Sequence, residues 1–348
     1  MKDAVLAFGN PSEDYSINIC LANETGQIVK QLTDGNSRDW FPAWSPNGQS
    51  IAYSSDKGST RHFYGLDQTD YSLTALTSPE EAAHINPKRK LHPMPNGTAQ
   101  VWIMDADGSN QRPLTSEGAN AHPAWSPDGD QIAFNSTRTG KLELFLMDAD
   151  GSNQRQLTHS PDETAGPFER LRHIELLMHS LYSPDVHGPT NIFPTWSPDG
   201  TRLAFCSIGQ ESYAIWVMDM NSRKFTRITY PGDGLHPQAN CPFWSPTSDQ
   251  ITYWSGIHVG PGSIWLMNAD GSNPRRVSDE PEGAICDEPS WSADGSKILY
   301  TTNRQDEREG LKSAVWVTNP DGTSQHPLVK NAIPGFNRAS WKRVSASI

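Results

Sequence analysis

The chain has 348 residues, with 28 Lys and Arg against 40 Asp and Glu, which gives a net charge of −12. This balance lacks the basic surface that binds a phosphate backbone, so the sequence predicts no nucleic-acid partner. No apolar stretch approaches the roughly 20 residues that cross a bilayer, so no membrane insertion is expected.

The first residues contain no export signal, because the apolar run that ends at Phe8 is shorter than the core of a signal peptide. The chain as it stands is therefore expected in the cytoplasm, whereas removal of a signal peptide would place it in the periplasm or outside the cell. The cysteines follow no zinc-like spacing and are expected as free thiols. They are Cys20, Cys206, Cys241 and Cys286.

Three short apolar runs open the chain, at residues 4–8, 17–21 and 30–33. They match the second, third and fourth strands of a four-strand unit whose clearest copy spans residues 122–158. Pro-Asp-Gly and Asp-Gly pairs separate the strands of that copy, and such pairs are typical of tight hairpins between antiparallel strands. We name the strands of each unit A to D. Strand A ends at a tryptophan.

The strand-A tryptophan recurs along the chain and counts the units. It stands at Trp44, Trp125, Trp196, Trp244, Trp291 and Trp341. Residues 63–67 and 73–77 follow Trp44 at the spacing of strands C and D, and a second C and D pair follows at 101–105 and 113–115. The segment between these pairs then predicts a degenerate seventh unit without its tryptophan, whose Pro87, Pro93 and Pro95 cannot donate to a strand ladder.

Strand A of the last unit has no strand B after it, and the first unit lacks a strand A. The two ends therefore complete one sheet and close a ring. The sequence predicts an all-β, seven-bladed β-propeller that forms a single domain over residues 1–348, with six blades plus an insertion as the alternative. A helical insertion is expected at about 159–192, because Leu171, Ile174 and Met178 line one stripe at helical spacing.

The Trp-Ser-Pro-Asp-Gly and Met-Asp-Ala-Asp-Gly-Ser-Asn segments resemble the TolB-type propeller repeat, which is also called WD40-like or PD40. The resemblance covers nearly the whole chain and implies the propeller fold. It implies little about activity, because the matched residues form turns and core while the family serves many functions. A Gly-Xaa-Ser-Xaa-Gly nucleophile elbow is absent, which disfavours a peptidase.

The alternating direction of strands A to D predicts which face of the ring is functional. The A–B and C–D turns share one face of the ring, and the longer B–C and D–A connections share the other, where binding residues are usually mounted. The side chains expected to contact a ligand there are Trp40, Asn240, Trp254, Asp287, Glu288 and Asn337.

The histidines predict a metal site on the same face. His122 stands three residues before its strand-A tryptophan, and His84 is its counterpart in the degenerate unit. Converging imidazoles near a ring axis suit a divalent metal such as Mn, Zn or Ca, with His187 or His236 as further ligands. The alternative is that these histidines line a water-filled channel as hydrogen-bonding residues.

Two functions follow from these patterns. The first is a non-catalytic binding module, expected to be a monomer, that recognises a protein, peptide or saccharide. The second is a polysaccharide lyase, because the chain also resembles oligogalacturonate lyases, which have seven blades of this repeat and a histidine-rich manganese site. In that case His122 or His236 is the candidate base for β-elimination, and Arg338 or Arg61 is the candidate clamp for the uronate carboxylate.

Overall fold

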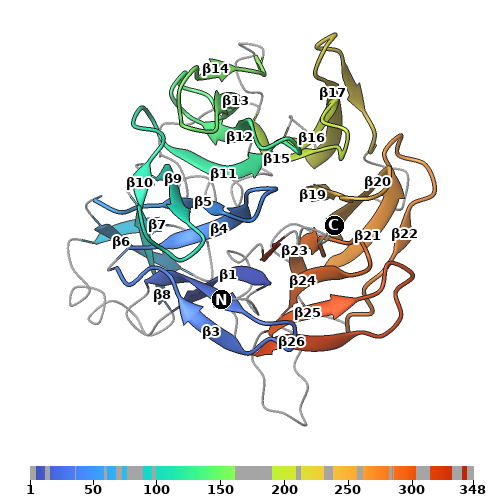
Figure 1. Ribbon diagram of the computed structural model, residues 1–348, viewed down its shortest axis with the longest axis horizontal. Coiled ribbons are helices and arrows are strands. Elements are labelled where there is room, and N and C mark those ends of the chain that lie inside the picture. Colours follow the sequence, from blue (N-terminus) through green and yellow to red (C-terminus); the bar gives the residue numbers. More distant parts are fainter. Residues whose placement is uncertain are drawn as a thin grey trace.

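The computed structural model describes residues 5–11, 16–35, 37–58, 61–67, 73–76, 89–95, 99–160, 190–208, 213–230, 238–256, 262–281, 284, 286–302, 314–330 and 339–342. The regular structure within these ranges is entirely β, and the strands form six four-stranded antiparallel sheets and one three-stranded sheet. The six larger sheets are the blades of a propeller arranged around a ring (Figure 1).

Each blade runs from an inner strand A to an outer strand D. Blade I contains β27 (Ser340–Trp341), β1 (Leu6–Pro11), β2 (Ile17–Ala22) and β3 (Ile28–Gln31). Blade II contains β4 (Asp39–Trp44), β5 (Ser50–Ser55), β9 (Gln100–Asp105) and β10 (Arg112–Pro113). Blade III contains β11 (Asn120–Trp125), β12 (Gln131–Ser136), β13 (Glu143–Asp148) and β14 (Arg155–Gln156).

The second half of the chain continues the same order. Blade IV contains β15 (Thr190–Trp196), β16 (Arg202–Ile208), β17 (Tyr213–Asp219) and β18 (Phe225–Arg227). Blade V contains β19 (Ala239–Trp244), β20 (Gln250–Gly256), β21 (Gly262–Asn268) and β22 (Arg275–Arg276). Blade VI contains β23 (Cys286–Trp291), β24 (Ile298–Thr302), β25 (Ala314–Thr318) and β26 (His326–Lys330).

The prediction of seven blades is wrong. β9 pairs along its whole length with β5, so residues 100–105 are strand C of the Trp44 blade. Residues 63–67 and 73–77, predicted as strands C and D of the Trp44 blade, contribute instead to a separate three-stranded sheet. Its strands are β6 (Arg61–Asp67), β7 (Leu73–Leu76) and β8 (Arg89–Pro95), in the order β7-β6-β8, and β8 comes from the segment predicted as the degenerate blade. This sheet is inserted between strands B and C of blade II, so the fold is the alternative of six blades plus an insertion.

The position of β8 at the edge of the inserted sheet explains why it can contain prolines. Pro93 and Pro95 lie on β8, which is an edge strand paired only with β6. Proline is tolerated on an edge strand because no ladder hydrogen bond is lost on the outer side.

The helical insertion expected at 159–192 is also not part of the fold. Among the described residues none is helical, Thr190–Trp196 forms β15, and residues 161–189 lie outside the described ranges. The described part of the chain likewise contains no helix long and apolar enough to cross a membrane. All four cysteines are buried and free.

The predicted closure of the ring is confirmed. β27 pairs with β1, with Leu6 opposite Trp341 and Ala7 opposite Ser340. The backbone N–H of Lys342 donates to the Val5 carbonyl at 2.7 Å, which extends this pairing. The two ends of the chain thus share blade I.

Repeated side chains hold the blades in register. The hydroxyl near the end of strand D accepts a hydrogen bond of 2.8–2.9 Å from the first part of strand C; these acceptors are Thr33, Thr115, Thr158, Thr229 and Ser278. The indole Nε1 of three strand-A tryptophans, Trp125, Trp196 and Trp291, donates to a backbone carbonyl of the preceding blade at 3.1–3.2 Å. The aromatic and Leu-Thr signatures of the repeat are therefore explained by packing and by hydrogen bonds between strands and blades.

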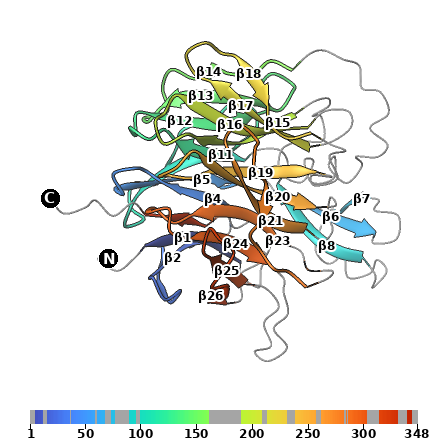
Figure 2. The ribbon, with the colours of Figure 1, turned by 90° about the vertical axis from the view of Figure 1, so that its right-hand side faces the viewer.

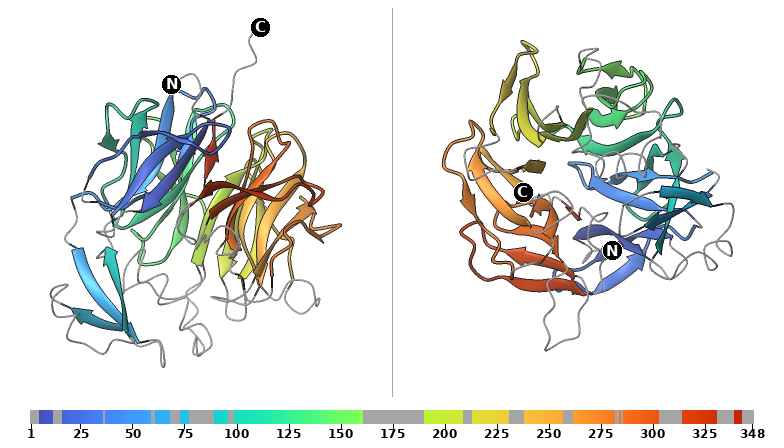
Figure 3. Two further views of the ribbon diagram at one scale, coloured as in Figure 1. Left: turned by 90° about the horizontal axis from the view of Figure 1, so that it is seen from below. Right: turned by 180° about the vertical axis from the view of Figure 1, so that it is seen from behind.

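Strand direction divides the propeller into two faces. We call the face with the A–B and C–D turns the turn face, and the opposite face, with the B–C and D–A connections, the loop face. The inserted sheet β6–β8 belongs to a B–C connection and stands apart from the ring on the loop face (Figures 2 and 3).

Candidate functional site

Strand A of five blades carries a bulge beside the axis of the ring. The pairing of strands A and B shifts between the residues four positions and one position before the tryptophan. The residue three positions before the tryptophan has a left-handed φ of 49° to 57° in every case, although none of these residues is glycine. We call this set the axial residues. They are Phe41, His122, Phe193, Cys241 and Glu288.

The sequence contains a local reason for this conformation. A proline follows each axial residue in these five blades. The ring of a proline disfavours the right-handed helical region for the residue before it, and its missing N–H leaves no donor unpaired in the bulge. A left-handed non-glycine residue still costs roughly 1–2 kcal/mol, so the surrounding blades must hold it in place.

One side of the axis is filled by aromatic rings. The ring centroid of His122 lies 4.1 Å from that of Phe41 and 4.3 Å from that of Phe193, and the two phenylalanine centroids are 6.4 Å apart. Only 3% of His122 is exposed. The residues one position earlier on these strands are Trp40, Ala121 and Ile192, which belong to the same buried cluster. Blades II to IV therefore present an apolar wall to the axis.

The opposite side of the axis is more polar, although Cys241 is buried and belongs to the same apolar cluster as Phe41 and Phe193. Blades V and VI place Cys241 and Glu288 at the axial position, with Asn240 and Asp287 one residue earlier. Asn240 Oδ1 accepts a hydrogen bond from the N–H of Cys241 at 2.7 Å, and Asp287 Oδ1 accepts one from the N–H of Glu288 at 2.8 Å. Both side chains are half-buried and stabilise the bulge that follows them.

A buried tyrosine lies close to this polar side. Burial raises the pKa of the Tyr213 hydroxyl well above its usual value. The nearby Cys206, Cys241 and Asp287 side chains raise it further, because a negative charge on any of them disfavours a phenolate. Tyr213 therefore stays a neutral hydroxyl, and it connects blade IV to the polar half of the axis.

Polar residues at the start of strand A anchor the D–A connections of blades II to IV. Asp39, Asn120 and Asn191 occupy the same repeat position and are buried. Asn120 Nδ2 donates to Gln100 Oε1 at 2.8 Å, and Asn191 Nδ2 donates to Glu143 Oε2 at 2.9 Å. Both bonds tie strand A to strand C of the preceding blade.

Asp39 differs from its two counterparts because it is a carboxylate. Ser55 Oγ and Ser37 Oγ donate to it. Burial raises the pKa of Asp39 above its usual value, and the hydroxyl donors offset part of this effect. Since the folded-state pKa lies above that of the unfolded chain, the folded state binds more protons between the two values, and stability falls as the pH rises through that interval.

We therefore expect Asp39→Asn to stabilise the protein by about 1 kcal/mol at neutral pH, because an amide in this position avoids burying a charge. The gain should disappear in acid, below the ordinary Asp pKa of about 3.9. Urea denaturation at both pH values measures the effect. Asp34→Asn, at an exposed residue of the same connection, removes the same charge and should change little. Equal gains in both variants would contradict this explanation.

The structure brings four of the predicted ligand-binding residues to the axis. Trp40 and Glu288 are buried there, and Asn240 and Asp287 are half-buried. Trp254 lies elsewhere, in the buried cluster between blades V and VI, where a Cβ added to Gly262 would lie 2.2 Å from its Nε1. Asn337 and Arg338 lie outside the described residues, and so does the side chain of Arg61. Sequence reasoning missed the left-handed bulge, although the repeated proline was a signal for it.

The predicted metal site stays a prediction. Of its four histidines, His84, His187 and His236 lie outside the described residues, and His122 lies between two phenylalanine rings. Within the described ranges no three His, Cys, Asp or Glu side chains form a group suited to a metal ion.

Comparison with known proteins identifies the repeat. The family model of the TolB beta propeller domain, PD40, matches residues 183–331. An uncharacterized protein of Agrobacterium fabrum, Atu1656, is 33% identical over 107 residues, which cover 31% of this chain and 34% of that protein. The chain spans between 17% and 34% of the length of the curated relatives that it matches.

Solved structures share the architecture of the whole chain. TolB from Acinetobacter baumannii superposes with a TM-score of 0.62 at 16% identity, over 97% of this chain and 66% of that one. A protein from Agrobacterium tumefaciens assigned as TolB superposes with a TM-score of 0.58 at 18% identity, over 98% of this chain and 99% of that one. At these identities the likeness establishes the fold.

Proposed function

We propose that this chain, of which residues 183–331 match the TolB beta propeller domain, is a non-catalytic binding module that recognises a protein or peptide segment on its loop face. The observation that carries the proposal is the division of the axial surface into an apolar wall from blades II to IV and a polar wall from blades V and VI. A peptide presents the same two kinds of group, since its side chains alternate with backbone N–H and C=O groups.

The polar wall supplies a group suited to a peptide carbonyl. Asn240 uses Oδ1 to accept a hydrogen bond from its own strand, and among the described residues its Nδ2 donates to none. An amide side chain has two donors on that nitrogen, and Asn240 is half-buried rather than enclosed. A peptide carbonyl placed against Asn240 Nδ2 would accept a hydrogen bond from it. The side chains of the same peptide could then cover the apolar wall.

The inserted sheet supports the same face. β6–β8 stands on the loop face beside blade II (Figure 3), which also supplies Trp40 and Phe41 to the apolar wall. Binding residues are commonly mounted on such connections of a rigid scaffold. A ligand that reaches across the axis from blade V to blade II would end beside this sheet.

The proposal is tested with a displayed library of random peptides selected against the wild-type protein. We expect selected peptides to bind Asn240→Leu at least roughly tenfold more weakly, because a lost buried hydrogen bond to a ligand costs on the order of 1–2 kcal/mol. Asn268→Leu is the matched control and should leave binding unchanged, because Asn268 is likewise half-buried but ends β21 on the opposite face.

Three results would reject the proposal. The first is that no peptide is enriched over a surface without protein. The second is that Asn240→Leu and Asn268→Leu bind the selected peptides equally well. The third is release of unsaturated uronate from an oligogalacturonate substrate by the purified protein, which would make the chain a lyase instead. Elemental analysis of the same preparation tests the predicted metal site, for which Mn, Zn or Ca in a stoichiometric amount would be expected.

A further inference from the structure

A second surface lies on the turn face, where the six strands A converge. A cavity of about 140 Å³ opens there; we call it the tryptophan funnel. Its walls are the six strand-A tryptophans and the prolines that follow four of them, and Phe41 and His122 also line it. An apolar cavity of about 150 Å³ is large enough for a benzene-sized group. The funnel is therefore suited to one apolar side chain.

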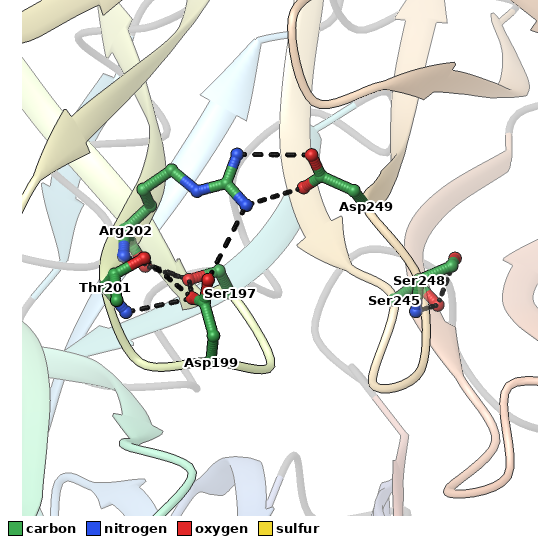
Figure 4. Close-up of polar contacts among 7 residues, drawn as sticks. All are labelled: Ser197, Asp199, Thr201, Arg202, Ser245, Ser248 and Asp249. Atoms are coloured by element: carbon green, nitrogen blue, oxygen red, sulfur yellow. Dashed lines mark hydrogen bonds and ion pairs between the residues drawn. The ribbon is translucent and has the colours of Figure 1, made fainter.

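The charges around the funnel are set by one position of the repeat, six residues after the strand-A tryptophan. In blade IV this residue is Arg202. Its guanidinium donates to both carboxylate oxygens of Asp249 in blade V, at 2.8 and 3.3 Å, and lies 3.9 Å from Asp199 of its own blade (Figure 4). It also lies 4.8 Å from the ring centroid of Trp244. One arginine thus compensates the carboxylates of two neighbouring turns and contacts the ring of Trp244, which lines the funnel.

Blade VI has a cation at the same position. Lys297 Nζ donates to Asn319 Oδ1 in the C–D turn of its own blade at 2.5 Å. Blades IV and VI therefore contain a positive charge where the A–B and C–D turns meet.

Blade III lacks this compensation. Its residue at the repeat position of Arg202 is Gln131, and the corresponding residue of the preceding blade is Ser50. Asp249 of blade V forms an ion pair with Arg202 of the preceding blade. Asp130 occupies the same repeat position in blade III, but the preceding blade has Ser50 in place of the arginine, and Asp130 forms no ion pair with Arg or Lys within the described part of the chain.

The turns of blade III form an acidic recess of about 570 Å³ beside the funnel. Its lining contains Asp128, Asp130, Asp148 and Asp150 and no Lys or Arg. One cation lies beside it: Arg112 Nη1 of blade II donates to the Asp150 carbonyl at 3.2 Å, so Asp128, Asp130 and Asp148 are the carboxylates farther from that charge. Hydrogen bonds from Ser126 and Ser152 lower the pKa of Asp128 and Asp150, respectively, so these two carboxylates are ionised at neutral pH. Pro127 lines the funnel and Asp128 follows it directly, so the funnel and the acidic recess are adjacent.

We infer that the turn face binds a basic, extended segment of a partner protein, which inserts one apolar side chain into the tryptophan funnel and lays its Lys or Arg side chains over the carboxylates of blade III. Charge complementarity selects this partner, because unlike charges steer and orient association. The apolar insertion supplies the desolvated centre that usually dominates binding energy. This surface opens on the face opposite to the proposed peptide site, although Phe41 and His122 contribute to both. Its test uses Gln131, which belongs to neither wall of the peptide site.

The inference is tested with a short fluorescein-labelled peptide of alternating Arg and Leu, whose binding is followed by fluorescence anisotropy at low salt. The wild-type protein should bind it, and binding should weaken as salt is added. Gln131→Arg introduces into blade III the residue type that blade IV has at this repeat position. The added positive charge should repel the basic peptide and weaken binding roughly three- to tenfold. Gln250→Arg makes the same change of net charge at the same repeat position of blade V, away from the acidic recess, and should leave binding close to the wild-type value.

Two further peptides separate the two parts of the surface. A peptide of alternating Arg and Gly keeps the charge but has no side chain for the funnel, and it should bind more weakly than the Arg-Leu peptide. A peptide of alternating Glu and Leu should not bind. The inference is overturned if the Arg-Leu peptide fails to bind, if Gln131→Arg and Gln250→Arg weaken it equally, or if the Arg-Gly peptide binds as tightly. It is also overturned if sedimentation shows that the wild-type protein self-associates through this face and that Gln131→Arg abolishes that association, because a second copy would then be the occupant.

Discussion

A chain that ends at Arg338 is expected to lose most of its stability, because it lacks β27. Leu6 and Phe8 are fully buried, and β27 covers β1 on its inner side. Without β27, β1 becomes an exposed inner edge, blade I has three strands, and the side chain of Trp341 no longer packs against the blade I cluster. Natural domains are stable by only about 5–15 kcal/mol. Loss of a fully buried Trp costs about 3–5 kcal/mol; half-buried Trp341 contributes less, and the loss of buried Ala339 and of the β27 pairing adds to it.

Urea denaturation followed by tryptophan fluorescence measures this effect. The matched control ends at Lys342, which keeps β27 and the hydrogen bond from Lys342 to Val5, and it should unfold at the wild-type urea concentration. If the chain that ends at Arg338 unfolds at the same midpoint as this control, the ring does not depend on its closure.

Gly26→Ala is expected to destabilise the protein by about 3 kcal/mol. Gly26 lies in the C–D turn of blade I with a φ of +78°, which disfavours a residue with a Cβ. The added Cβ would also lie 1.7 Å from the carbonyl oxygen of Leu328, which belongs to β26 of blade VI. Since that contact is with backbone, blades I and VI would have to move apart.

Gly140→Ala separates the two causes. Gly140 has a φ of +81°, but a Cβ there meets no atom within 4 Å. Only the conformational cost of about 1 kcal/mol should therefore appear. The difference between the two variants in urea denaturation measures the contact between blades I and VI. Equal losses would mean that this contact is relieved without cost.

The sequence predicted the repeat unit, the all-β class and the shared blade, but it misplaced one pair of strands. The distance from Trp44 to residues 63–67 matches the repeat spacing, so spacing alone did not distinguish an inserted hairpin from strand C. Turn chemistry does distinguish them. β9 ends at Asp105, which opens an Asp-Gly turn like that of β13, whereas β6 has no Asp-Gly pair after it. The strand that pairs with β5 is thus β9, the one that is followed by the Asp-Gly turn of the repeat.

The candidate site was predicted in part. The position three residues before the tryptophan was identified as axial, and the described members of this set line the axis. Their packing was not predictable from spacing, because the contact of His122 with Phe41 and Phe193 depends on a left-handed backbone that no single residue type requires. The polar wall was likewise not visible as a unit, since Asn240 and Asp287 belong to blades far apart from Trp40 in the chain.

The pairing of Leu6 with Trp341 has a consequence for the connectivity of the propeller. In blades II to VI a short A–B turn joins these two strand positions, and in blade I the same positions are separate chain ends. A Pro-Asp-Gly-Asp linker between Lys342 and Val5 would give the six residues that separate Trp125 from Ile132 in blade III, reproduce that turn and make the backbone circular. A circular permutant opened instead at Gly200, in the A–B turn of blade IV, would then keep the same six sheets with its new termini on the same face.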